Sequence, residues 1–476
     1  MTKELDLGTG KISSLIRRFS IPCVISMVVA ALYNIVDQIF IGWSEAGAYG
    51  NAATNIVYPF TVLALGIALL IGDGAAAGFS IELGKGDKKQ ADRMIGNGLI
   101  LLLIAAVILT AFGFLLQTQI LSVFGADPAE AECYGYAEEY YRVICCGIPF
   151  YMIGQGLNAS IRSDGAPGYA MACTLAGAIT NLIMDPVMIF GFGMGVRGAA
   201  IATIMGKILT FVMSLFYLTR SRNFRISRQS VLPEKMTILR ILSVGMASLI
   251  VQLSIVIIIA VNNNLMTKYG YETIASTGEP YGAVIPLAVV GIVMKVFGIV
   301  VSIVIGISLG GQPILGFNIG AGNIDRVKET IQLLTKLVLS VGAIAFLIFE
   351  LAPGAVISLF GSHNTPEYME FARLCIRIFL GGIILTCYIK SAAIILQSMG
   401  NSTRSTLLAL LRDVIIFVPA SVLLAECSHS IVVMLWAPLI SDVIAACFGF
   451  LFVSGEIHRF ENVIQQSTAE EKIKNS

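Results

Sequence analysis

Residues 284–304 read "VIPLAVVGIVMKVFGIVVSIV", an apolar run in which Lys295 is the only charged residue. A helix needs about 20 such residues to cross the hydrocarbon core of a bilayer. The runs at 99–114 and 250–261, taken with their flanks, have the same character. Runs of this kind are too apolar and too numerous for the interior of a soluble protein. The sequence therefore predicts an all-α, polytopic membrane protein.

The composition of the whole chain supports this class. Of its 476 residues, 56% are hydrophobic and 13% are charged, whereas a soluble domain carries roughly 25% charged residues. The formal net charge of +1 provides no bulk attraction to nucleic acid. The nine cysteines are scattered without paired spacing, so we expect neither a disulfide framework nor a zinc site.

Polar breaks between the apolar runs predict twelve transmembrane helices. The most polar internal stretch, 220–235, falls between the sixth and the seventh of them. We therefore expect an N-terminal six-helix lobe at 1–219, a cytoplasmic linker at 220–237, a C-terminal six-helix lobe at 238–455 and a cytoplasmic tail at 456–476. The predicted spans are 15–42, 52–83, 94–117, 137–160, 169–192, 196–219, 238–267, 281–317, 327–352, 370–398, 404–425 and 430–455.

The distribution of basic residues predicts the orientation, because cytoplasmic loops of membrane proteins are enriched in lysine and arginine. If the N-terminus is cytoplasmic, the outer loops hold few cations, and the inner segments hold most of them. Those inner cations include Lys85, Lys88, Lys89, Arg93, Arg220, Arg222, Arg225, Arg228 and Lys235. Both termini are therefore expected in the cytoplasm.

The two halves of the chain resemble each other. "LGKGDKKQA" (83–91) aligns with "IGAGNIDRV" (319–327) at an offset of 236, and the same offset aligns "LSVFG" (121–125) with "ISLFG" (357–361). Because each half has an even number of spans, the repeats share one orientation in the membrane. Parallel repeats of this kind enclose a cavity between the two halves, which is a transporter architecture.

A carboxylate interrupts the apolar run that includes "NLIMDPVMIF" (181–190), although burying it in hydrocarbon is costly. Asn181 and Asp185 are spaced i,i+4, so they share one helix face. Pro186 frees a backbone carbonyl one turn back. Together with Asp37 and Thr203 they could bind a hard cation through oxygen or hold a proton. The alternatives are a structural hydrogen-bonded pair and, for Asp37, an aspartate wetted at the end of its helix.

Other motif matches carry no function. "GMGVRG" (193–198) fits a dinucleotide-binding pattern but lies between membrane spans rather than after a strand. "GISLG" (306–310) fits a nucleophile elbow, yet its serine is inside an apolar helix with no histidine available. The sequence has no Walker-type loop and no nucleophile–base constellation. We therefore expect neither an enzyme nor an ATP-driven pump.

Four segments resemble signatures of the multidrug and toxic compound extrusion (MATE) family, within its prokaryotic DinF- and MepA-like branch. The similarity covers about residues 12–455, and it implies the MATE-type fold of two pseudo-symmetric six-helix bundles. The segments are "YNIVDQIFIG" (33–42), "NLIMDP" (181–186), "GAAIAT" (198–203) and "GQPILGFNIGAGN" (311–323).

The resemblance also implies roles for individual residues. The positions that match the family's cation or proton site are Asp37, Asn181, Asp185 and Thr203, and Tyr33 and Asn158 match the adjacent pocket. Lys207, also assigned to the substrate cavity, departs from the family, which usually has a glutamine there. Its ammonium could repel a bound cation, pair with Asp185 or extend away from the site, and it puts sodium coupling in doubt. The carboxylates that some relatives use in spans seven and ten are absent, so coupling is expected in the N-terminal half.

Three features of the second half concern charged residues within predicted spans. Lys295 is either a cation of the substrate cavity or a residue that pairs with a polar neighbour, and Lys390 has no assigned role. Arg412 and Asp413 are expected to neutralise each other.

By this resemblance the chain is a secondary active multidrug efflux antiporter that exchanges amphipathic, cationic compounds for protons or sodium ions. The alternative is a flippase for lipids or lipid-linked oligosaccharides, which the lysines at 207, 295 and 390 would favour. No cofactor is expected besides the coupling ion. The expected partners are small amphipathic molecules and the bilayer, without nucleic acid. We expect a monomer that spans a bacterial-type cell membrane many times.

Overall fold

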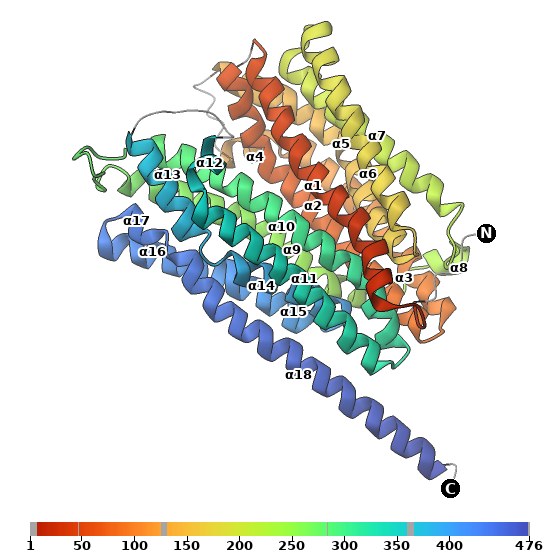
Figure 1. Ribbon diagram of the computed structural model, residues 1–476. Helices are drawn as coiled ribbons and strands as arrows, with labels where there is room; N and C mark the ends of the chain where they lie inside the picture. The colour runs from red at the N-terminus through yellow and green to blue at the C-terminus, as the bar shows by residue number, and fades with distance from the viewer. Residues whose placement is uncertain (1–6, 46, 125–130, 283, 359–365, 475–476) are drawn as a thin grey trace. The chain divides into compact units, whose positions relative to one another are not determined.

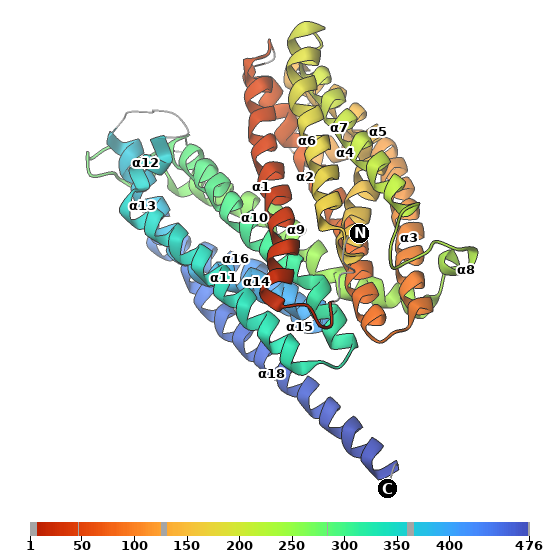
Figure 2. The ribbon, with the colours of Figure 1, turned by 45° about the vertical axis from the view of Figure 1, so that its right-hand side comes forward.

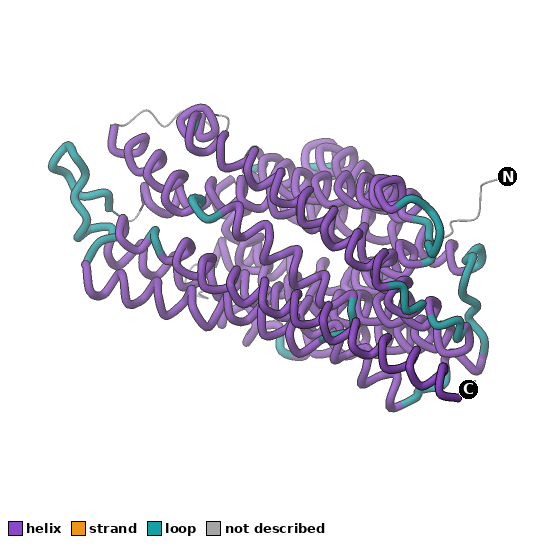
Figure 3. Tube along the Cα trace, turned by 60° about the horizontal axis from the view of Figure 1, so that its bottom comes forward, coloured by secondary structure: helices purple, strands orange, loops and turns teal. Residues whose placement is uncertain are grey.

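The computed structural model describes residues 7–45, 47–124, 131–282, 284–358 and 366–474. Helices and loops make up these residues, and none of them belongs to a strand (Figures 1 and 3). One isolated antiparallel bridge joins Ile274 and Pro280. The all-α class predicted from the sequence is confirmed for the described residues.

The chain divides into two compact units that are not contiguous in sequence. The first consists of Met1–Gln252, Leu309–Asn323 and Gln397–Ser402, and the second of Leu253–Ser308, Ile324–Leu396 and Thr403–Ser476. Two long helices contribute residues to both units, α9 (Lys235–Tyr269) and α10 (Val284–Gly320). The lobe, linker and tail boundaries given above stay predictions.

The first unit is built from the N-terminal helices and the second largely from those after α10. Helices of the first are α1 (Ile12–Trp43), α2 (Gly47–Gly84), α3 (Lys88–Leu115), α4 (Gln117–Val123), α5 (Ala131–Ser163), α6 (Pro167–Pro186), the π-helix η1 (Val187–Gly191), α7 (Gly195–Leu218) and α8 (Arg228–Val231). Those that follow α10 are α11 (Ile324–Leu351), α12 (Pro353–Ser358), α13 (Pro366–Phe379), α14 (Ile383–Ser398), α15 (Ser402–Leu410), the π-helix η2 (Leu411–Ile416), α16 (Phe417–Ser428), α17 (Ile431–Met434) and α18 (Ala437–Lys474).

Each of the twelve predicted spans coincides with a helix or with consecutive helices of the described chain. Ten helical segments are long and apolar enough to cross a membrane, and an eleventh is added if α13 and α14, bent by 47°, form one span. The remaining segment, α5, is 33 residues long but does not pass the same test. Its N-terminal part carries Glu138, Glu139 and Arg142, which lower its hydropathy. The chain is a multi-pass membrane protein.

Apolar side chains on the outside of the helices match this environment. On α3, Val107 is 66% and Leu115 is 79% exposed. A soluble monomer rarely presents contiguous apolar surface of this kind to water. In a bilayer these side chains contact lipid tails, so their exposure costs nothing.

In the first unit α1 packs against α6, α6 against α7, and α5 against both α2 and α7 (Figures 1 and 2). The helices approach most closely at glycines. A Cβ on Gly74 would lie 2.1 Å from the carbonyl oxygen of Ile241, and one on Gly245 would lie 1.7 Å from that of Leu70. No side chain larger than hydrogen fits at either position, so these glycines set the spacing between α2 and the start of α9.

The polar stretch after α7 is bound to the helices of the first unit. The carboxylate of Asp164, between α5 and α6, accepts hydrogen bonds from the hydroxyl of Tyr217 at 2.7 Å and from the backbone N–H groups of Arg222 and Asn223, both at 2.8 Å. Burial raises the pKa of the Asp164 carboxyl, and these donors oppose that shift. Asn97 of α3 donates to the backbone carbonyl of Ser230 at 3.0 Å, which anchors α8.

Candidate functional site

The candidate site lies where α1, α6 and α7 meet in the first unit. α6 and α7 approach closely because both present glycine at the contact. A Cβ on Gly206 would lie 2.4 Å from the carbonyl oxygen of Gly177, and a Cβ on Gly177 would lie 2.2 Å from Oγ1 of Thr210. This close contact brings the polar residues of α6 next to the hydroxyl of Thr203 on α7.

The amide of Asn181 joins the predicted cation-site residues. Its Nδ2 donates to Oδ1 of Asp185 at 3.2 Å and to Oγ1 of Thr203 at 3.3 Å. The Asp37 side chain on α1 contacts that of Asp185 within hydrogen-bonding range. Two ionised carboxylates have no proton to donate to each other, so this contact needs a shared proton or a cation between them. All four residues predicted for the cation site are brought together.

Three oxygen atoms of this cluster lack a donor. Oδ1 of Asp37, Oδ1 of Asn181 and Oδ2 of Asp185 are buried, and no described residue donates a hydrogen bond to them. A buried oxygen without a partner costs about 1–3 kcal/mol. Carboxylate and carbonyl oxygens are the ligands of hard cations such as Na⁺ and are also acceptors for a proton. The cluster can therefore bind a small cation at this point.

A cavity of about 50 Å³ adjoins the cluster. Asn181 and Thr203 lie in its wall together with aromatic residues, among them Tyr33 and Tyr151. Drug-sized ligands occupy pockets of roughly 300–1,000 Å³, whereas a water molecule needs only about 10–15 Å³ of such space. The cavity in this conformation accommodates an ion with a little water and excludes a drug-sized molecule.

Lys207 is the only cationic side chain among the residues that line this cavity. Its Nζ lies 4.1 Å from the centre of the Tyr151 ring, a cation–π distance. It interacts electrostatically with Asp37, yet no ion pair joins it to any carboxylate of the described chain. The ammonium is thus close to the acidic cluster without being bonded to it.

Asn158, predicted to line the pocket, is engaged elsewhere in the same unit. Its Nδ2 donates to the carbonyl of Ala170 at 3.0 Å, and its Oδ1 accepts from Arg162 at 2.9 Å. Arg162 in turn donates to Asp73 at 3.4 Å, whose other oxygen accepts from Ser248 at 2.9 Å. Asn158 is not among the residues that line the cavity, and its predicted pocket role stays a prediction.

Lys295, the other predicted cavity residue, is exposed on α10 within the second unit. Its role also stays a prediction. Tyr140 of α5 had not been predicted for the site. It contacts the hydroxyl of Thr203 and interacts electrostatically with both aspartates. Nothing in the spacing of α5 distinguishes this tyrosine from the neighbouring Tyr141, which instead donates to the carbonyl of Gly113 at 3.0 Å.

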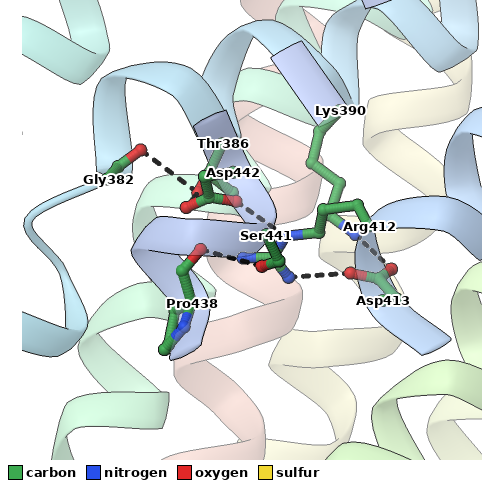
Figure 4. A network of polar contacts seen from close by, with 8 residues as sticks. All are labelled: Gly382, Thr386, Lys390, Arg412, Asp413, Pro438, Ser441 and Asp442. Atoms are coloured by element: carbon green, nitrogen blue, oxygen red, sulfur yellow. Dashed lines mark hydrogen bonds and ion pairs between the residues drawn. The ribbon is translucent and has the colours of Figure 1, made fainter. Parts of the chain in front are cut away.

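The second unit contains a buried charge cluster of its own (Figure 4). Arg412 donates to Asp413 at 2.7 Å and to Asp442 at 2.9 Å. Lys390 donates to the other oxygen of Asp413 at 2.7 Å, and the Thr386 hydroxyl to the other oxygen of Asp442 at 2.6 Å. The predicted neutralisation of Arg412 by Asp413 is confirmed, and Asp442 is the partner that had been missed. Two cations and two anions satisfy one another, so this cluster carries no net charge.

The cluster coincides with two irregular helical segments. Arg412 and Asp413 lie in the π-helix η2, and Thr386 follows the break between α13 and α14. A Cβ on Gly382 would lie 2.5 Å from Oδ2 of Asp442, so glycine is needed where the carboxylate meets this break. The charge cluster fixes the local geometry of α14, η2 and α18.

Comparisons with known proteins agree with this architecture. The family model described as MatE matches residues 22–187 and 259–423. The multidrug export protein MepA of Staphylococcus saprophyticus is 24% identical over 440 residues, which cover 91% of this chain and 92% of that protein. MepA of Staphylococcus aureus strain NCTC 8325 is also 24% identical, over 446 residues with the same coverage.

Solved structures support the same fold. An outward-facing multidrug resistance MATE transporter of the MOP superfamily superposes with a TM-score of 0.87 at 23% identity, covering 97% of this chain and 99% of that chain. A MATE structure in complex with MaL6 gives a TM-score of 0.88 at 23% identity, with 97% of this chain and 100% of that chain covered. At this level of identity the superposition establishes the fold and says nothing of the ligand.

Proposed function

Because the chain belongs to the MatE family, the multidrug and toxic compound extrusion (MATE) transporters, we propose that it is a secondary active antiporter. It exports amphipathic, cationic compounds in exchange for protons or sodium ions. The observation that carries this proposal is the set of three buried, donor-free oxygens on Asp37, Asn181 and Asp185. A site that binds and releases a cation needs such acceptor oxygens, and these three gather in one cluster on α1 and α6.

The coupling ion is held by the carboxylates of Asp37 and Asp185, with the Asn181 amide and the Thr203 hydroxyl completing the oxygen set. Loading the cluster lowers its negative charge and therefore its electrostatic repulsion across α1 and α6. Pro186 and the π-helix η1 follow Asp185 directly, and both are places where a helix bends. A change of charge at Asp185 can thus change the shape of α6 and of the cavity beside it.

The exported compound is proposed from two features. The curated relatives are named multidrug export proteins. In addition, the wall of the ion-sized cavity contains the aromatic faces of Tyr33, Phe150 and Tyr151. Aromatic faces attract lipophilic cations and tolerate varied shapes, which suits a site of broad specificity. The cavity must enlarge to admit such a compound, and the bend at Pro186 supplies a place for that movement.

The proposed orientation places both termini in the cytoplasm of a bacterial-type cell, with the protein as a monomer in the plasma membrane. The basic residues of the stretch between α7 and α9 then face the cytoplasm. Next to them, Arg93 and Glu234 pair at 3.3 Å and hold this stretch to α3.

The experiment is transport by the purified full-length chain in lipid vesicles. A pH gradient and a sodium gradient are imposed separately, and the movement of a fluorescent lipophilic cation such as ethidium is followed. We expect at least one of the two ion gradients to drive accumulation of the dye against its own concentration gradient. If neither gradient does so, and labelled lipid is instead moved between leaflets, the flippase alternative replaces the antiporter.

A further inference from the structure

Lys207 introduces a fixed positive charge into the proposed ion pocket. It lies in α7 one turn after Thr203, and both residues line the same cavity. The ammonium lies over the ring of Tyr151 at 4.1 Å rather than in an ion pair. Because the side chain is covalently bound to α7, this charge is not exchanged for another cation as a free ion would be.

The polar and titratable groups of the pocket region come from α1, α5 and α6, which pack against α7, and from α2. They include Tyr33 and Asp37 on α1, Tyr58 on α2, Tyr140 and Tyr151 on α5, and Asn181 and Asp185 on α6. Two of these groups are carboxylates. The other five are four tyrosines, uncharged while they keep their phenolic protons, and one uncharged asparagine. With both carboxylates ionised, the pocket carries two negative charges without Lys207 and a net charge of −1 with it; with one proton shared between them, the corresponding charges are −1 and 0.

This difference of one charge lowers the affinity of the pocket for a metal cation. Two unit charges roughly 6–8 Å apart repel each other, at an effective dielectric constant of about 20, by enough to weaken binding roughly 30- to 100-fold. The oxygens that would ligate Na⁺ are unchanged by the lysine. Its effect is electrostatic, and it acts against every added metal cation.

We propose that Lys207 is the residue that excludes sodium from this site. It is a tethered cation that reduces the attraction of the Asp37–Asp185 cluster for a free one. The proposal rests on the function proposed above and deepens it, because it names the residue that decides which ion the cluster accepts. A sodium gradient alone should then fail to drive efflux by the native protein.

The test measures sodium binding directly, on the purified full-length chain in detergent. The readouts are saturable binding of ²²Na⁺ and the sodium-dependent shift of the melting temperature at constant ionic strength. We expect binding too weak to saturate in the native protein, and saturable binding by Lys207→Gln at an affinity roughly 30- to 100-fold above the native limit. Lys207→Arg keeps the charge and should still exclude sodium. Lys268→Gln, which removes an exposed lysine from the end of α9, is the matched control and should behave as the native protein.

A second substitution locates the gained ion. In the Lys207→Gln background, Asp185→Asn should abolish the new binding, because it removes one of the two charges that hold the ion. Tight, saturable sodium binding by the native protein would overturn the proposal without any variant. So would a well-folded Lys207→Gln protein that binds no more sodium than the native chain. A failure of the antiporter function itself is distinct, since it appears as the absence of efflux under a pH gradient as well as under a sodium gradient.

Discussion

Nδ2 of Asn181 donates a hydrogen bond to Oδ1 of Asp185 over 3.2 Å, so a neutral amide fixes a buried carboxylate one helical turn further along α6. The other oxygen of Asp185 has no donor among the described residues. One half of the carboxylate is therefore held in position, and the other half is available to a proton or a metal ion. This division of roles is what a coupling site requires.

Asp185→Asn tests that division. The asparagine carbonyl can still accept from Asn181, and its new NH₂ can donate to Asp37, so folding should be spared. The titratable charge is lost, and we expect gradient-driven efflux to fall roughly tenfold or more with normal membrane levels. The measurement is dye efflux from vesicles at matched protein levels. Asp325→Asn removes an exposed carboxylate from the first turn of α11 and should leave efflux unchanged. If Asp185→Asn kept gradient-driven efflux at the native level, Asp185 would not have the proposed role in ion coupling.

Part of this site was predictable from spacing alone. Positions 181 and 185 had to share a helix face because their separation is i,i+4. Thr203 was proposed as an oxygen donor from its residue type and from a family resemblance, since its distance in sequence carries no geometric information. The structural reason is the glycine contact between Gly177 and Gly206, which brings α7 against α6. Sequence periodicity cannot identify which pair of helices approaches most closely.

In the charge cluster of the second unit, only the contact between adjacent residues was predictable from the sequence. Arg412 and Asp413 are adjacent, so their pairing was expected, but Asp442 lies thirty positions further along the chain. The π-helical turn η2 and the 47° bend after α13 were also not predicted. An apolar run looks the same whether its helix is straight or broken. Only the buried partners of Arg412 and Thr386 explain why the breaks are stable.

Removing one charged residue of this cluster should destabilise the protein more than removing one cation and one anion together. Asp442→Leu leaves Arg412 buried with an unsatisfied Nε, and such a loss costs about 3–5 kcal/mol. The double variant Arg412→Met with Asp442→Leu keeps the Lys390–Asp413 pair and has no uncompensated charge. We expect it to melt above the single variant Asp442→Leu.

Thermal unfolding in detergent, followed by circular dichroism, measures the difference. Arg373→Met, which removes an exposed arginine from α13, should change the melting temperature little. If the double variant melted at or below Asp442→Leu, the cluster would not be held together by mutual charge neutralisation.

The helix contact at Gly245 gives a purely steric prediction. A Cβ there would lie 1.7 Å from the carbonyl oxygen of Leu70, so Gly245→Ala forces α2 and α9 apart. Overpacking of this kind costs about 1–3 kcal/mol, and backbone contact places this case at the upper end. Gly291→Ala on α10 is the matched control, because a Cβ at that position would have no described neighbour within 4 Å. The melting temperature should fall for the first variant and not for the second; equal values would contradict the close contact.

Topology is the remaining expectation that a direct experiment decides. Arginine and lysine are retained on the cytoplasmic side during insertion. The stretch between α7 and α9 carries Arg220, Arg222, Arg225 and Arg228, and α9 begins with Lys235. Reporter fusions after Arg228 and after Lys474 should therefore both report the cytoplasm, and a fusion after Lys268 should report the outside. The three fusions together test the parity of the helices, including α5, whose acidic N-terminal turns keep it from passing the length-and-hydropathy test that the other predicted spans pass. If α5 did not cross the membrane, every segment after it would change sides relative to the N-terminus. The fusion after Arg228 would then report the outside, and the parallel arrangement of the two repeats would be lost with it.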